Sequence, residues 1–250
     1  MKTSLLAILT LTLTTAALTI GPLQSTEPSY RNKKLTAWLD DLDTLDLAQW
    51  TQAAEAVRAI GTNALPTLAN QLRAKDSLFR RRLIDLCETY PVIVLTPAEA
   101  RHETALEACR ILGPAASLLT PEIVRFFSNN RRTKAVKVLV AIGDRATEPL
   151  EKVLAGGDES ARAGAAVALG SIARQPQSAV AALTDRLQDS KAETRMAAAW
   201  ALGRFGASAK SAAAKLSLLT NDSAANVREQ AKVALDRIAW DAPTFASAPK

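Results

Sequence analysis

An alanine that recurs at the interval of a helical hairpin constrains the fold of this chain more than any other feature of its sequence. It stands eight residues before a column of glycine or alanine that recurs, after one longer first interval, about every 30 residues. The alanines are Ala53, Ala105, Ala135, Ala165, Ala198 and Ala231, and the second column, called here the helix-end column, is Gly61, Gly113, Gly143, Ala173, Gly206 and Ala239. Self-similarity at such a period is typical of stacked supersecondary units. The sequence therefore predicts an array of repeats.

Each repeat predicts an α-helix that closes at the helix-end column. Further apolar columns lie five, four and one residues before it, for example Val138, Leu139 and Ile142 before Gly143. Together with the alanine they follow the i, i+3, i+4, i+7 spacing of one helical stripe. Glycine at the column can take a positive φ and end the helix. A second apolar-periodic stretch then follows, as with Leu150, so we expect antiparallel helix pairs.

The composition agrees with an all-α fold. Hydrophobic residues make up 48% of the chain but aromatic residues only 4%, so the apolar content is mostly Ala, Leu, Val and Ile. Alanine and leucine are among the best helix formers, and strand-favouring residues are scarce. We therefore expect no β fold.

Three segments of the chain, AVRAIGTNALPTL, ALGRFGASA and VREQAKVAL, resemble HEAT repeats, especially the short bacterial kind related to bilin lyases. The resemblance covers about residues 48–240 and implies an armadillo-like α-α superhelix, the right-handed HEAT solenoid of antiparallel helix pairs. The opening YRNKKLTAWLDDLD is similar to the lead-in of exported bacterial HEAT proteins of unassigned role. Such arrays serve many tasks, so the resemblance is specific for fold and not for function.

The chain divides into four predicted segments. We expect a signal peptide or an uncleaved anchor at 1–25, a lead-in that caps the stack at 26–47, the solenoid at 48–240 and a disordered tail at 241–250. The first interval of the helix-end column is longer than the others, which predicts an extra helix and a loop at 76–97.

The N-terminal segment predicts export. Lys2 is followed by an apolar run without charge from Leu5 to Ile20, a pattern typical of a secretory signal peptide. We therefore expect a periplasmic or secreted protein. If the run is not cleaved, residues 5–20 would anchor the chain to a membrane.

An arginine column is the principal candidate site. Arginine stands eleven residues before the helix-end column at Arg132, Arg162, Arg195 and Arg228. Such a ladder could bind an acidic partner, or it could tie the loops of adjacent repeats together, where a planar guanidinium fork is useful. We favour the inter-repeat role, because Asp189 and Asp222 each precede the next arginine by six residues.

Residues that could support catalysis or metal binding are few. His102 is the only histidine, so a serine-type triad or a histidine-based metal site is almost excluded, and we expect this side chain to be solvated. An acidic cluster is expected to cap a helix and to be solvated rather than to bind calcium; its members are Asp40, Asp41, Asp43 and Asp46. We expect no cofactor and no metal.

Three further groups each have a structural interpretation beside a functional one. Arg80, Arg81 and Arg82 could grip phosphate, but adjacent helical residues point in different directions. Tryptophans near the two ends of the array are expected to cap the core, and Trp200 to pack beside it; the end residues are Trp38, Trp50 and Trp240. Cys87 and Cys109 could pair in an oxidising compartment, although their helix-core spacing favours two buried thiols.

Together, the composition, the repeats and the scarcity of catalytic residues predict a binding protein. The net charge is only +6 and no block of the chain is strongly basic, so we expect no nucleic-acid partner. We predict a non-enzymatic scaffold or adaptor of the cell envelope that binds another protein. The alternative, implied by the HEAT resemblance, is a cytoplasmic enzyme or enzyme subunit similar to bilin lyases or to DNA glycosylases.

Overall fold

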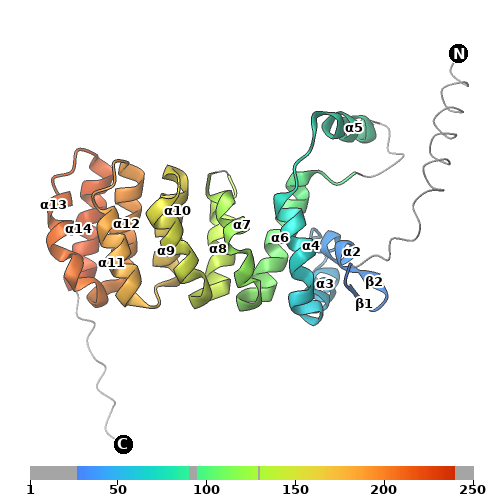
Figure 1. Ribbon diagram of the computed structural model, residues 1–250, viewed down its shortest axis with the longest axis horizontal. Helices are drawn as coiled ribbons and strands as arrows, with labels where there is room; N and C mark the ends of the chain where they lie inside the picture. The colour runs from blue at the N-terminus through green and yellow to red at the C-terminus, as the bar shows by residue number, and fades with distance from the viewer. Residues whose placement is uncertain (1–26, 90–94, 129, 240–250) are drawn as a thin grey trace, which may run out of the picture.

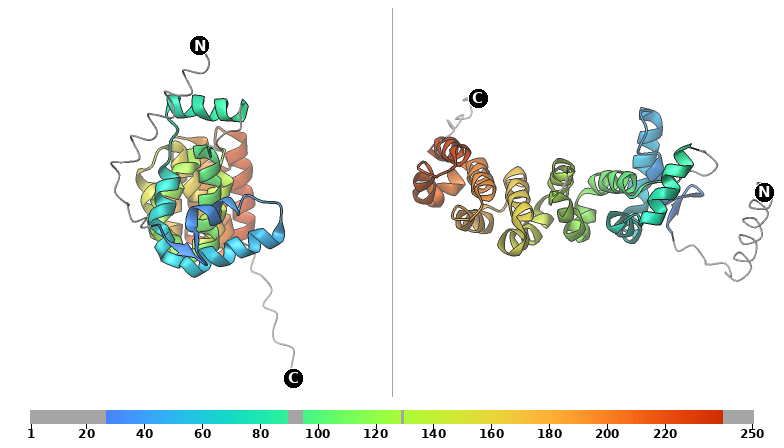
Figure 2. Two further views of the ribbon diagram at one scale, coloured as in Figure 1. Left: turned by 90° about the vertical axis from the view of Figure 1, so that its right-hand side faces the viewer. Right: turned by 90° about the horizontal axis from the view of Figure 1, so that it is seen from above.

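The computed structural model describes residues 27–89, 95–128 and 130–239. Helix pairs stand side by side in a long row, from the N-terminal end to the C-terminal end of the described chain (Figure 1). Figure 2 shows the same row from its end and from above. The predicted all-α superhelix of antiparallel helix pairs is confirmed. The predicted signal segment 1–25, the tail 241–250 and Trp240 lie outside the described residues.

In each pair a longer first helix precedes a shorter second helix. The first helices are α3 (Leu47–Ile60), α6 (Ala98–Leu112), α8 (Arg132–Ile142), α10 (Glu159–Ile172), α12 (Ala192–Phe205) and α14 (Ala225–Ala239). The second helices are α4 (Leu65–Arg73), α7 (Thr120–Val124), α9 (Thr147–Gly156), α11 (Pro176–Arg186) and α13 (Ala213–Leu219). Short 3-10 turns join several of them: η1 (Gly61–Ala64), η2 (Gly113–Leu119), η4 (Gly143–Ala146) and η5 (Gly206–Ala212), with η3 (Arg125–Ser128) after α7.

The alanine column lies at the centre of the stack. All six of its members are completely buried, and so is nearly every residue of the apolar columns beside it. The exceptions are Leu112 and Leu235, which are partly buried and pack on the same core. The register predicted from the repeat is therefore the packing register.

The helix-end column ends the first helices α3, α6, α8, α10 and α12 with a positive φ, whereas its last member, Ala239, is the final residue of α14. Gly61, Gly113, Gly143 and Gly206 have φ between 54° and 72° with ψ between −127° and −140°, a region open almost only to glycine. Each leads directly into a 3-10 turn. Ala173 instead takes the ordinary left-handed conformation, φ 46° and ψ 38°, and a short loop rather than a 3-10 turn leads to α11. The residue type at this column therefore selects the connection.

Glycines inside the first helices allow those helices to touch, a role that the sequence analysis missed. A Cβ on Gly170 of α10 would lie 2.6 Å from the Cα of Ala201 in α12. A Cβ on Gly203 of α12 would lie 3.1 Å from the Cα of Ala234 in α14. Successive first helices therefore approach backbone to backbone at these positions.

The N-terminal lead-in forms a small cap on the first pair. An antiparallel pair of two-residue strands, β1 (Ser29–Tyr30) and β2 (Lys33–Lys34), turns through Arg31 and Asn32, both with positive φ. This hairpin was not predicted from the sequence. Helix α2 (Leu35–Asp40) follows and buries Trp38, whose Nε1 donates to the carbonyl of Tyr30 at 3.1 Å.

The extra helix expected within 76–97 is α5 (Leu78–Thr89), and it stands apart from the row of pairs (Figure 1). Residues 90–94 of the expected loop lie outside the described residues. Helical spacing places several of its apolar residues together. Among the α5 side chains that the structure describes, only Ile84 is buried, while Leu78, Phe79 and Leu86 are exposed. None of the helices within the described ranges is long and apolar enough to cross a membrane.

Substitution of Gly170 tests the helix contact. We expect Gly170→Ala to lower the free energy of unfolding by about 1–3 kcal/mol, because the new methyl group meets the backbone of Ala201. The matched control is Gly156→Ala at the end of α9, where a Cβ meets nothing within 4 Å. It should stabilise by about 0.5–1 kcal/mol through helix propensity. Equal urea midpoints for the two variants would contradict the close approach.

Candidate functional site

The arginine column follows one geometric rule in all four repeats. Each guanidinium donates to the backbone carbonyl five residues before it, in the segment that leads into its own helix. The donor to acceptor distances are 2.8 Å for Arg132 to Phe127, 2.9 Å for Arg162 to Gly157, 3.2 Å for Arg195 to Ser190 and 3.0 Å for Arg228 to Ser223. Each arginine thus fastens the segment that precedes its first helix to the first turn of that helix.

Two of the arginines also bind a carboxylate of the following repeat. Arg162 donates through Nε and Nη2 to the two oxygens of Asp189, at 2.8 and 3.0 Å. Arg195 makes the same bidentate contact with Asp222, at 2.8 Å for both bonds. Each aspartate also accepts a backbone N–H of its own loop, from Lys191 at 3.0 Å or from Ala224 at 2.9 Å. The contact joins the entry loops of adjacent first helices.

The partners differ from those suggested by the six-residue spacing. The Asp189 carboxylate binds Arg162 of the preceding repeat, and only its carbonyl accepts from Arg195, at 2.9 Å. Arg132 pairs instead with Glu193, two repeats further along. The Arg195 side chain is only 15% exposed. This geometry favours the inter-repeat interpretation, because little of the guanidinium is left to meet an acidic partner.

The ion pairs perturb the carboxylates as expected for charge-assisted hydrogen bonds. The hydrogen bonds from Arg195 hold the pKa of Asp222 below its ordinary value. Because the folded-state pKa is lowered, the carboxylate stabilises the fold at pH values above its unfolded pKa of about 3.9. This contribution to the free energy of unfolding is lost as the pH falls through the folded pKa. The tie therefore operates at neutral pH.

His102 is not the solvated residue that the sequence predicted, and that expectation was wrong. Its Nε2 lies 2.9 Å from the carbonyl oxygen of Ala74, and its ring meets the edge of Phe126 at a centroid distance of 5.1 Å. Burial lowers the pKa of the imidazole. These contacts come from the residue that follows α4 and from η3, so His102 joins α6 to neighbouring parts of the stack.

The acidic cluster acts locally. Asp46 caps α3 by accepting the N–H groups of Ala48 and Gln49, which is the capping role expected of the cluster. Asp41 forms an ion pair with Lys33. Among the described residues, no group of His, Cys, Asp or Glu is arranged to hold a metal ion.

The remaining sequence candidates are mostly packed. Arg80 bonds Asp76 at 3.0 Å, whereas Arg81 and Arg82 are exposed. Trp38 is buried and Trp50 packs on the core. Cys109 is a free, buried thiol whose pKa burial raises to about 12, so it is unreactive. The structure therefore favours the buried thiol at Cys109 over a pair with Cys87, whose side chain lies outside the described residues.

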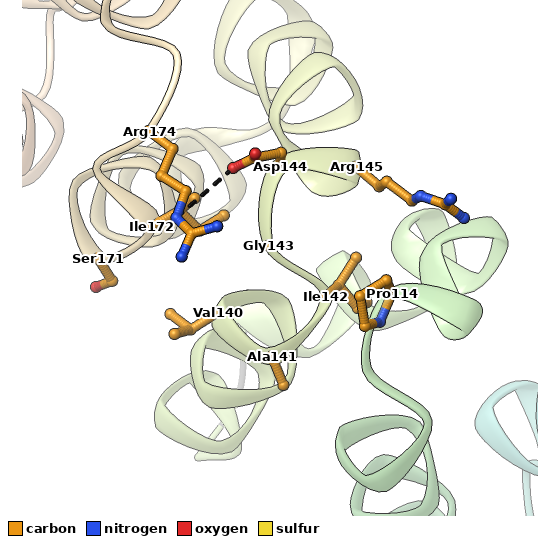
Figure 3. Close-up of a pocket in the computed structure, with 10 residues that line it drawn as sticks. All are labelled: Pro114, Val140, Ala141, Ile142, Gly143, Asp144, Arg145, Ser171, Ile172 and Arg174. Carbon is orange, nitrogen blue, oxygen red and sulfur yellow. Dashed lines mark ion pairs between the residues drawn. The ribbon is translucent and has the colours of Figure 1, made fainter. Parts of the chain in front are cut away.

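One groove lies at the C-terminal ends of α8 and α10. It has a volume of about 610 Å³ and is lined by apolar side chains, including Val140 and Ile142, and by charged side chains of the connecting turns. Figure 3 shows Arg174 directed toward Asp144, at 3.9 Å, while Arg145 points away. The charged groups near the groove are thus paired across it or turned outward.

A second groove, called here the Trp200 groove, crosses the first-helix face of the solenoid. Its volume is about 250 Å³, and side chains of α8, α10, α12 and α14 contribute to it. Its lining residues are Arg132, Ala163, Val167, Glu193, Met196, Ala197, Trp200 and Gln230. The ion pair between Arg132 and Glu193 lies among them, and the buried Nε2 of Gln230 has no hydrogen-bond partner in the described chain. Trp200 packs on the core as predicted, but the groove that it lines was not foreseen.

Comparison with known proteins agrees with this repeating architecture. The model of the family described as HEAT repeats matches residues 147–236, the range that runs from the start of α9 into α14. Residues 147–236 are therefore HEAT repeats. The match covers the repeats that carry both the arginine ties and most of the Trp200 groove.

Solved structures similar to this chain include natural and designed proteins. A designed armadillo repeat protein in complex with the peptide (KR)4 is 18% identical, with coverage of 82% of this chain and 99% of that chain and a TM-score of 0.43. An engineered protein is 20% identical, with coverage of 82% and 96% and a TM-score of 0.42. Human deoxyhypusine hydroxylase in complex with glycerol is 18% identical, with coverage of 82% and 84% and a TM-score of 0.38. These scores are too low to support an argument about function. Among curated proteins, no significant match is found.

A double-mutant cycle tests the inter-repeat tie in the HEAT array. We expect Arg195→Ala and Asp222→Ala each to lower the free energy of unfolding, with a coupling energy of about 1–3 kcal/mol at pH 7, because the bidentate bond is charge-assisted and partly buried. The coupling should disappear on acidification below the folded pKa of Asp222. The cycle between Arg195 and Asp189 is the control, since no side-chain bond joins them; a coupling below about 0.3 kcal/mol in both cycles would leave the arginine column without a structural role.

Proposed function

We propose that this protein is a non-enzymatic scaffold or adaptor of the cell envelope, and that it binds a segment of another protein in the Trp200 groove. The observation that carries the proposal is the groove itself, in which apolar side chains of successive first helices surround one tryptophan. A concave apolar site with few polar groups is the usual form of a binding site.

The lining of the Trp200 groove has the composition of an interaction hot spot. Tryptophan and arginine dominate the energetics of protein interfaces, and methionine adapts its shape to a partner. Val167 of α10 and Met196 and Trp200 of α12 supply the apolar surface. The Arg204 guanidinium lies 6.0 Å from the centre of the Trp200 ring, a cation–π arrangement that restricts the ring. A preformed surface loses little conformational entropy on binding.

The polar groups around the groove suit a peptide segment. The amide nitrogen of Gln230 lacks an acceptor, and a buried donor gains a hydrogen bond at little cost when a carbonyl oxygen reaches it. A backbone carbonyl of an extended segment provides such an acceptor. The groove residues are held by helices that pack backbone to backbone, so the site is positioned by the rigid part of the solenoid.

Export is the second part of the proposal. Lys2 and the uncharged run from Leu5 to Ile20 support a location outside the cytoplasm. The enzyme alternatives, similar to bilin lyases or to DNA glycosylases, would act in the cytoplasm, so location separates the two classes of function.

The location can be measured on the protein from its native host. We expect intact-mass spectrometry of the envelope fraction to find a chain that has lost about 17–25 residues from its N-terminus, because signal peptidase cleaves after the apolar run. An uncleaved chain in the membrane fraction would indicate the anchor. A full-length soluble chain in the cytoplasm would reject export and revive the enzyme alternatives.

The binding role can be measured by affinity capture. We expect Trp200→Ala to weaken retention of the partner from envelope extract at least about tenfold, as for a hot-spot residue. The control is Leu218→Ala, because Leu218 is an exposed apolar side chain that lies on the second helix α13, outside the lining of the groove. Both variants should melt as cooperatively as the parent chain. A partner that binds both variants with unchanged affinity would place the binding site elsewhere.

A further inference from the structure

Helix α5 presents an apolar face that the rest of the chain leaves exposed. The exposed fractions are 80% for Leu78, 72% for Phe79 and 55% for Leu86. Arg81 and Arg82 are exposed on the same helix. Large apolar side chains gathered on one exposed element mark an interaction surface. Here Arg82 stands three or four residues from each of them, on the same side of the helix.

The insertion is fastened at its base, so α5 is held in place although it stands apart from the helix pairs. Asp76, in front of α5, accepts the N–H of Ala98 at 2.7 Å and bonds of 3.0 Å from Arg80 and Arg101. Arg80 also donates to the carbonyl of Thr96 at 3.2 Å. One carboxylate thus joins the segment that enters the insertion to the segment that leaves it. Arg80 bonds to this base, and Arg81 and the buried Ile84 line the groove beside it. The opposite face of α5, with Phe79, Arg82 and Leu86 at helical spacing, is therefore the one presented outward.

A second exposed surface has the opposite charge. The connection between α2 and α3, called here the acidic loop (residues 40–47), exposes Leu45 by 106% and Leu47 by 75%. Asp40 and Asp43 are exposed beside them. Partial burial and the negative charges of Asp41 and Asp43 raise the pKa of Asp40. The loop therefore combines exposed leucines with a negative charge that its own chain neutralises only in part, through the ion pair of Lys33 with Asp41.

The two surfaces complement each other. Leucines and a phenylalanine on α5 lie beside Arg82, and the leucines of the acidic loop lie beside aspartates, so contact would bury apolar area and pair opposite charges at once. Within one chain they do not cover each other, since Phe79 and Leu45 are both exposed. We propose that α5 of one copy docks on the acidic loop of a second copy.

Both surfaces belong to the N-terminal end of the solenoid, where α2 and α5 lie (Figures 1 and 2). A two-fold arrangement lets each copy contribute α5 to one contact and the acidic loop to the other, so that the interface is isologous and closed. The result is a dimer joined at its N-terminal ends. The Trp200 groove lies in later repeats and is not used, so this contact is independent of the proposed partner site.

Charge reversal tests the proposal on the full chain by sedimentation velocity over a concentration series. The parent chain should dimerise, more weakly at high salt. An arm variant, Arg82→Glu, and a loop variant, Asp40→Lys with Asp43→Lys, should each be monomeric at concentrations where the parent is dimeric. An equimolar mixture of the two should dimerise again, because each altered surface then meets one of opposite charge. Asp46 is left unchanged because it caps α3.

Neutral substitutions separate docking from folding. Phe79→Ser and Leu45→Ser should each weaken dimerisation at least about tenfold with an unchanged melting curve, because both side chains are exposed. Leu218→Ser, at an exposed leucine of α13, should leave dimerisation unchanged. A parent chain that stays monomeric, or an association that neither charge variant weakens, would overturn the proposal. Binding of a monomeric parent chain to anionic lipid vesicles through Phe79 would overturn it as well, since the occupant of α5 would then be a membrane.

Discussion

The close approach of successive first helices is the contact on which the rest of this structure depends. At Gly170 and Ala201, and again at Gly203 and Ala234, no side chain separates one helix backbone from the next. Dispersion contacts add up when surfaces fit this closely, so small residues here contribute more than larger ones would. The buried alanine column extends the same principle along the whole array. Because the first helices are fixed against each other, the second helices and the connecting loops need only cover the remaining apolar stripe.

The loops then follow from the repeat length. In the later repeats, Asp189 lies 27 residues after Arg162, and Asp222 lies 27 residues after Arg195. This constant separation brings each aspartate to the arginine of the preceding repeat. Arg132 and Arg162 are three residues closer in sequence than Arg162 and Arg195, and the connection from α9 to α10 is correspondingly short. Six residues before Arg162, where the later repeats have aspartate, stands Gly156. Arg132 pairs with Glu193 instead. Arg132 thus has a different carboxylate partner because the loop between α9 and α10 is three residues shorter than the loops that follow it.

The features that sequence could predict are those set within one helix. The i, i+3, i+4, i+7 columns depend on the geometry of a single helix, and the positive φ after it depends on a glycine, so both were predictable. His102 was misjudged because its partners, Ala74 and Phe126, come from distant parts of the chain. The in-helix glycines were missed because their role exists only against a neighbouring backbone. Helical spacing also groups Phe79 with Leu86, but it cannot tell whether another helix covers that face.

The distribution of charge decides which surfaces are left for partners. The arginine column, the most regular charged feature of the sequence, directs its guanidinium groups to carbonyls and carboxylates of the entry loops, so its positive charge is largely neutralised within the fold. The first-helix face between these ties is therefore left with an apolar groove, where shape and a single amide discriminate between ligands. The charges of α5 and of the acidic loop are less fully used inside the chain. A contact between copies at that end would place two Trp200 grooves on one dimer. A partner with two matching segments would then bind with a higher affinity than either segment alone, because binding of the first segment raises the effective concentration of the second.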